Sequence, residues 1–102
     1  MAYETADFHY LTILRELEKF VLELGTGFCF VARQMRLQID GDDFYIDLVF
    51  YNRLLHCYVL VDLKIGKLTH QDLGQMQMYV NHFDRHVKRD DEHSTVGIVL
   101  CK

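Results

Sequence analysis

The sequence contains no proline, no repeat, no low-complexity tract and no stretch with the composition of a linker. We therefore expect residues 1–102 to form a single domain, and its end directly after the last predicted strand is consistent with a piece trimmed from a longer parent protein. No apolar run approaches the roughly 20 residues needed to cross a bilayer, and no signal-peptide pattern opens the chain. These absences predict a cytoplasmic protein that has no membrane partner.

An excess of positive charge is also absent. The chain has 11 Lys and Arg against 15 Asp and Glu, which gives a net charge of −4. Proteins that coat nucleic acid without specificity are usually basic, so this class is disfavoured. An enzyme that holds nucleic acid through metal ions is not excluded.

Cysteine is scarce. Cys29, Cys57 and Cys101 are widely spaced and form no Cys-x-x-Cys pair. This pattern indicates neither a disulfide framework nor a zinc ribbon. Because all three lie in apolar stretches, we expect unpaired and buried thiols.

Two segments show helical periodicity. Apolar residues recur at three- and four-residue intervals over 7–24, where Gly25 ends the predicted helix, and again over 70–87. The expected buried stripe of the second helix is Leu73, Met76, Val80, Phe83 and Val87.

Strand patterns fill most of the remaining chain. Runs rich in aromatic and β-branched residues predict strands at 28–39, 44–51, 56–65 and 95–102, the last of them buried on both faces. Turn signals join the first three, DGDD at 40–43 and NRL at 52–54. The order helix, strand, strand, strand, helix, strand predicts an α/β fold, in which an antiparallel meander and one parallel strand form a mixed four-stranded sheet flanked by helices.

Charged residues interrupt the third predicted strand. Asp62 and Lys64 lie two residues apart in VLVDLKIGK, so they project from the same face. Taken singly, each is most simply interpreted as an edge-strand charge that faces solvent. An ionised group among apolar residues, however, needs a partner or a bound cation.

A third charge, Asp47, lies in the preceding strand. The alternation of FYIDLVFY places it on the face opposite Phe44, Ile46, Leu48 and Phe50. Two aspartates on neighbouring strands converge if they share a face, and their charges then repel unless a divalent cation lies between them. Mg²⁺ suits such a pair, and Lys64 beside it would stabilise developing negative charge.

These residues carry a family resemblance. The pairing of Ile46-Asp47 with Asp62-Leu63-Lys64 resembles the signature of the PD-(D/E)XK nuclease superfamily, whose core has the order αβββαβ. LELGTGFCFVARQ, FYIDLVFYNRLLHCYVLVDLKIGKL and GQMQMYVNHFD are more specifically similar to the C-terminal nuclease domain of YhcG-type proteins, from about residue 20 to residue 102. The resemblance implies a restriction-endonuclease-like fold and hydrolysis of phosphodiester bonds, with DNA as the expected substrate and RNA as the alternative.

The resemblance also implies a metal centre. Asp47 and Asp62 match the metal-binding carboxylates, with the main-chain carbonyl of Leu63 as a third ligand, and Lys64 matches the catalytic lysine. Glu23, in LELG, matches an acidic residue that holds the metal or its water. The implied cofactor is Mg²⁺ or Mn²⁺.

Other positions of the sequence can also be compared with the family pattern. Gln75 and Tyr79 resemble a Gln-x-x-x-Tyr helix motif, and Gln34 matches a polar family position to which no role is assigned. Ile46 stands where the superfamily has proline, which leaves the chemistry intact. Asp62 stands where the YhcG-type pattern has glutamate, so its arm is shorter by one methylene.

Two other functions are weighed against the nuclease. The first is a catalytically idle domain of the same fold that binds nucleic acid or mediates assembly; the intact Asp47, Asp62 and Lys64 argue against it. The second is a small homodimeric interaction module outside the nuclease fold. A domain of 102 residues has little surface for recognition, so we expect a homo-oligomer or a missing N-terminal recognition domain to supply specificity.

Overall fold

The computed structural model describes residue 15, residues 18–19, residue 22 and residues 25–101. In chain order the elements are β1 (Phe28–Ile39), β2 (Asp42–Asn52), β3 (Cys57–Lys64), α2 (His70–His82), the π-helical turn η2 (Phe83–Val87) and β4 (Val96–Cys101). The described residues between 15 and 22 are helical, as predicted, but most of the predicted helix 7–24 lies outside the described residues.

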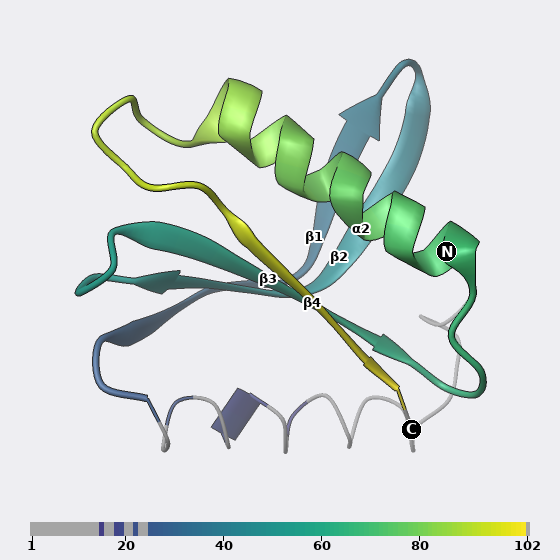
Figure 1. The fold of residues 1–102 in the computed structure, drawn as a ribbon, viewed down its shortest axis with the longest axis horizontal. Helices are drawn as coiled ribbons and strands as arrows, with labels where there is room; N and C mark the ends of the chain where they lie inside the picture. The colour runs from purple at the N-terminus through teal and green to yellow at the C-terminus, as the bar shows by residue number, and fades with distance from the viewer. Residues whose placement is uncertain (1–14, 16–17, 20–21, 23–24, 102) are drawn as a thin grey trace.

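The four strands form one sheet in the order β1-β2-β3-β4. β1, β2 and β3 pair antiparallel, and β4 pairs parallel to β3 after the crossover through α2, which lies across one face of the sheet (Figure 1). The predicted mixed four-stranded α/β architecture is confirmed. No helix in the described part of the chain has both the length and the apolar character that a membrane span requires.

The turns follow from their residues. Ile39 pairs with Asp42, so only Asp40 and Gly41 form the first hairpin loop, and both have positive φ (51° and 85°), as tight hairpin turns require. The second turn is longer than predicted. It spans 53–56, where Asn52 Oδ1 accepts hydrogen bonds from the backbone N–H groups of the next two leucines, both at 3.0 Å.

Buried side chains form two clusters on opposite faces of the sheet. The α2-side cluster contains Leu37, Ile46, Val49, Leu60, Met76, Tyr79 and Phe83. The opposite cluster contains Leu48, Phe50, Cys57, Val59 and Val61.

The prediction that the apolar residues of β2 all point to one face of the sheet is wrong, because the pattern breaks at Asp47. Phe44 and Ile46 belong to the α2-side cluster, whereas Leu48 and Phe50 belong to the opposite one. Strict alternation would put all four on the same face. The strand therefore changes the face of its apolar residues at Asp47.

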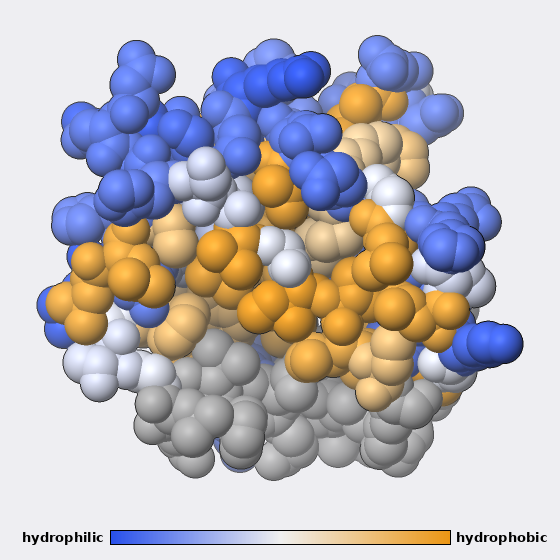
Figure 2. Space-filling view, in the orientation of Figure 1, coloured by the Kyte–Doolittle hydropathy of each residue, from blue (hydrophilic) through white to orange (hydrophobic). Residues whose placement is uncertain are grey.

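The predicted burial of β4 is also wrong. β4 is the last strand of the sheet, and Val96 and Ile98 are exposed. Figure 2 shows a band of hydrophobic side chains on the surface formed by β4 and the adjoining side of α2. The exposed Leu73 of α2 lies beside β4 and contributes to this surface. The buried stripe of the second helix is accordingly shifted: Tyr79 is buried, while Leu73 and Val87 are exposed.

The expectation for the thiols is correct in one respect. All three cysteines are free, as predicted, but only Cys57 is buried. Cys29 and Cys101 are exposed because each lies on an edge strand of the sheet, where apolar sequence neighbours do not ensure cover.

The packing of α2 against β4 leads us to a prediction about two glycines. A Cβ at Gly97 would come within 2.8 Å of both Met76 Sδ and Val80 Cγ2, whereas a Cβ at Gly74 meets nothing within 4 Å. We expect Gly97→Ala to lower the free energy of unfolding by about 1–3 kcal/mol through overpacking. Gly74→Ala should raise it by about 0.5–1 kcal/mol, since Gly74 is an exposed helix-interior position. Urea unfolding followed by circular dichroism measures both, and equal signs for the two variants would contradict this packing.

Candidate active site

The ladder between β2 and β3 ends at the two predicted aspartates. Its last regular rung joins Leu48 to Val61, so the next rung faces Asp47 with Asp62. Here the Asp47 N–H donates to Asp62 Oδ1 at 2.9 Å, and the Leu63 N–H donates to Asp47 Oδ2 at 2.8 Å. Each aspartate carboxylate thus accepts a backbone N–H group of the facing strand where the regular ladder ends.

Beyond this rung the two strands separate. β2 continues along β1 as far as the pairing of Asp42 with Ile39, while β3 continues along β4 as far as Lys64. The carboxylates of Asp47 and Asp62 therefore lie at the fork between two strands. The predicted convergence of these residues on adjacent antiparallel strands is confirmed.

The fork has an unusual electrostatic environment. Asp47 is only 2% exposed. The pKa of Asp62 is raised from 3.8 to about 7, chiefly by burial; the Asp47 N–H opposes this rise, and the negative charges of Asp47 and Asp72 add to it. Two acids held together with this little solvent favour a shared proton or a bound cation.

Lys64 is held from the start of α2. Its Nζ lies 3.4 Å from Asp72 Oδ1, and about a third of its side chain (37%) remains exposed. Asp72 is fixed in turn by a capping box: its N–H donates to Thr69 Oγ1 (3.2 Å), and the Thr69 N–H donates to Asp72 Oδ2 (2.8 Å). Hydrogen bonds from Thr69 and then the charge of Lys64 hold the pKa of Asp72 below its usual value.

Asp72 was not predicted as a site residue. The Thr-x-x-Asp pattern at 69–72 is a signal for a helix N-terminus. That pattern carries no information about which strand end lies next to the helix, so only the fold reveals the contact with Lys64.

The two members of the predicted helix motif are placed differently. Tyr79 is buried, and its hydroxyl donates to the main-chain carbonyl of Tyr45 at 3.5 Å. Burial, and then the charges of Asp62 and Asp47, raise the pKa of Tyr79 well above its usual range, which places the phenol beside the carboxylates. Gln75 lies one turn earlier on α2 and is exposed.

Glu23 lies outside the described residues. Within the described part of the chain, no three or more His, Cys, Asp or Glu side chains form a cluster that could hold a metal ion. The donor set that the structure describes at the fork is therefore the pair Asp47 and Asp62, together with nearby main-chain oxygens.

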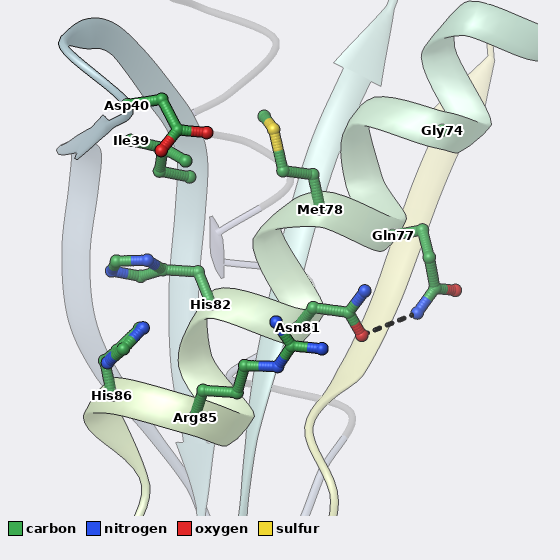
Figure 3. A pocket seen from close by; sticks show the side chains of 9 residues that line it. All are labelled: Ile39, Asp40, Gly74, Gln77, Met78, Asn81, His82, Arg85 and His86. Carbon is green, nitrogen blue, oxygen red and sulfur yellow. Dashed lines mark hydrogen bonds between the residues drawn. The ribbon is translucent and has the colours of Figure 1, made fainter.

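A second concave surface lies between the β1–β2 turn and the last turns of α2 (Figure 3). Its volume is about 420 Å³, and its lining includes Asp40, Gln77, Asn81, His82, Arg85 and His86. The rings of His82 and His86 lie side by side, with centroids 5.1 Å apart, and burial followed by the charge of His86 lowers the pKa of His82. The aspartates of the fork are not part of this lining.

Comparisons with known proteins identify the family and the fold of this chain. The family model described as YhcG PDDEXK nuclease domain matches residues 3–102. "Putative nuclease YhcG" from Escherichia coli (strain K12) is 46% identical over 99 residues, which are 97% of this chain and 26% of that protein. The chain thus spans about a quarter of the curated relative that it matches.

A solved structure shares the fold. The crystal structure of a repair endonuclease from Pyrococcus abyssi matches with a TM-score of 0.61 at 20% identity, over 99% of this chain and 39% of that chain. At this identity the likeness establishes the restriction-endonuclease-like architecture alone. Because the family model covers nearly the whole sequence and the relative is close in sequence, this chain belongs to the family of YhcG PDDEXK nuclease domains.

Proposed function

We propose that this chain is a metal-dependent deoxyribonuclease domain in which Asp47 and Asp62 bind the cation and Lys64 stabilises the transition state. One observation carries the proposal. The two carboxylates meet at the fork of β2 and β3, and Lys64 follows Asp62 by two residues on the same strand. Family membership supports nuclease activity. The metal ion, the DNA substrate and the roles of the individual residues are our proposal.

The residues at the fork fit a divalent cation. A buried Asp47 beside an Asp62 whose pKa is raised to about 7 is a pair of acids whose negative charges repel, and a divalent cation between them would relieve that repulsion. Mg²⁺ and Mn²⁺ prefer oxygen ligands, and Mg²⁺ is commonly held by one or two carboxylates while it keeps several waters. Asp47, Asp62 and the main-chain carbonyl of Leu63 supply such a set, and we propose Glu23 as a further acidic contact.

The remaining roles follow from position. Asp47 and Asp62 would hold the cation, which would supply polarisation of the scissile phosphate and a lower pKa for an attacking water. Lys64 has a partly exposed ammonium group, which can turn from Asp72 to the phosphate and stabilise the charge that develops there. Tyr79 stays protonated, so it can donate a hydrogen bond but cannot act as a base near neutral pH. Gln75, exposed on the same helix, is proposed to contact the substrate beside the fork.

DNA is the substrate that we favour. The chain belongs to a nuclease family, and DNA is the substrate that this family resemblance implies. With a net charge of −4 and a compact surface, the chain is poorly suited to bind nucleic acid through bulk charge. We propose that a recognition domain or a second copy of the chain contributes to specificity.

The first prediction concerns stability without metal. Asp62 has a pKa of about 7 when folded and an ordinary value of 3.8, so the unfolded chain ionises first as the pH rises. Its contribution to stability is full below about pH 4, falls between pH 4 and 7, and stays low above that. In EDTA at pH 8, Asp62→Asn should therefore unfold with a free energy on the order of 2–4 kcal/mol higher than wild type, and this difference should vanish near pH 4.

Addition of metal should reverse the order of stability of wild type and Asp62→Asn. Millimolar Mg²⁺ or Mn²⁺ should raise the melting temperature of wild type, because a ligand that binds only the folded state stabilises it, and should raise that of Asp62→Asn much less. Asp91→Asn is the matched control, since Asp91 is an exposed loop aspartate with a side chain 73% exposed. An equal gain for wild type and Asp62→Asn would rule out cation binding at the fork.

The second prediction concerns cleavage. Wild type should cut DNA in the presence of Mg²⁺ or Mn²⁺ and stop in EDTA, and Asp62→Ala should abolish the activity. Lys64→Met should lose about 2–4 kcal/mol of transition-state stabilisation, or roughly 30- to 1,000-fold in rate, while Mg²⁺ still raises its melting temperature. The assay follows end-labelled single-stranded, duplex and branched DNA, together with RNA.

Lys67→Met serves as the control for lost lysine charge, because Lys67 is exposed in the segment after β3. Its rate should stay close to that of wild type. Equal rates for wild type and Asp62→Ala would reveal a contaminating nuclease. Tight DNA binding without cleavage by wild type would favour the idle binding domain.

A further inference from the structure

Gln34 has a backbone conformation that is rare inside a strand. Its φ is 50°, in the left-handed region, although it lies in the middle of β1. The other non-glycine residues with positive φ in the described part of the chain, Asp40 and His56, lie in turns. Glycine is the residue that adopts such a φ without strain, and strained non-glycine residues tend to occur at functional sites.

The side chain of Gln34 is unusual as well. Its Nε2 is buried and, among the described residues, has no hydrogen-bond partner. A buried amide without a partner is costly. Both the backbone and the side chain of Gln34 are therefore unfavourable in the protein alone.

The register of the sheet places Gln34 next to the fork. Arg33 pairs with Leu48 and Met35 with Ile46, so Gln34 stands opposite Asp47. Asp47 in turn stands opposite Asp62 on β3. Gln34, Asp47 and Asp62 thus occupy corresponding positions on three neighbouring strands, next to the regular pairs Arg33–Leu48 and Leu48–Val61.

We infer that Gln34 is a substrate-contacting residue whose amide N–H group donates a hydrogen bond to a non-bridging oxygen of the phosphate held at the fork. This inference rests on the proposed nuclease function and adds a specific contact to it. A neutral amide has two N–H donors and does not titrate, so it can bind a phosphate oxygen next to two carboxylates without altering their charge. The bound phosphate would supply the acceptor that Nε2 lacks.

Two substitutions separate this role from a structural one. Gln34→Gly removes the amide and relieves the backbone, so its melting temperature should equal or exceed that of wild type. Gln34→Met keeps the backbone and nearly the side-chain volume while it removes both N–H donors. Both variants should lose about 10- to 100-fold in kcat/KM, the usual effect of a lost hydrogen bond to a charged group.

His56→Gly is the matched control. It makes the same backbone change at φ 51°, in the exposed turn at 53–56. It should show a gain in melting temperature similar to that of Gln34→Gly, and its kcat/KM should match that of wild type. If Gln34→Gly or Gln34→Met cleaves as fast as His56→Gly, or if a loss of activity in both only follows a loss of stability, the inference is overturned while the proposed nuclease stands.

A second readout does not need catalysis. Affinity for a short DNA, measured by fluorescence anisotropy with Ca²⁺ in place of Mg²⁺, should fall about 10-fold or more in both Gln34 variants and not in His56→Gly. Failure of wild type to cleave any substrate would overturn the proposed function. In that case equal DNA affinities for wild type and the Gln34 variants overturn the inference as well, and a selective loss of affinity preserves the contact.

Discussion

The structure depends on one pair of hydrogen bonds, in which two carboxylates accept backbone N–H groups at the end of a β-ladder. Asp62 accepts the N–H of Asp47, and Asp47 accepts the N–H of Leu63. In a continuing antiparallel pair, backbone carbonyls of the facing strand are the acceptors, and only alternate N–H groups of each strand point toward it. With side chains as acceptors, both N–H groups remain satisfied while the strands separate. The fork thus exists without orphaned amides, and the same oxygens become available as ligands.

This solution has an energetic cost that the rest of the fold offsets. Asp47 is buried, and ionised Asp62 is disfavoured enough for its pKa to reach about 7. The carboxylates lie between two apolar clusters on opposite faces of the sheet, which exclude the water that would otherwise solvate them. The low local dielectric that makes the fork unstable in the free protein strengthens its attraction for a cation. Instability and proposed function therefore have one physical source.

Local sequence patterns predicted most of the fold. β1 begins and ends where its aromatic and β-branched run does, and Asp40-Gly41 forms the expected tight hairpin. The meeting of Asp47 with Asp62 was also predictable, since both lie in strands joined by a short turn. These features depend on neighbours along the chain or across one hairpin.

The predictions that were wrong or missing concern contacts between segments far apart in the sequence, and a local sequence pattern does not contain such contacts. Alternation in β2 changes face at Asp47 because the strand leaves β3 there. β4 has the composition of a central strand, yet it is the last strand of the sheet, and the exposure of Cys101 follows from that position. Asp72 belongs to the site only because the crossover brings the start of α2 to the end of β3.

That crossover contact also gives Lys64 a defined position beside the fork. Asp72 is immobilised by Thr69, so the acceptor that holds Lys64 has a fixed place relative to α2. The ion pair at 3.4 Å is partly exposed and therefore weak, which means that a phosphate at the fork can compete for the ammonium group at little cost. Asp72 also raises the pKa of Asp62 through its charge, and a released Lys64 leaves that charge less compensated. In the proposed reaction, the Asp72 carboxylate therefore links two properties of the site. It sets the position of Lys64, and its negative charge contributes to the attraction of the fork for a cation.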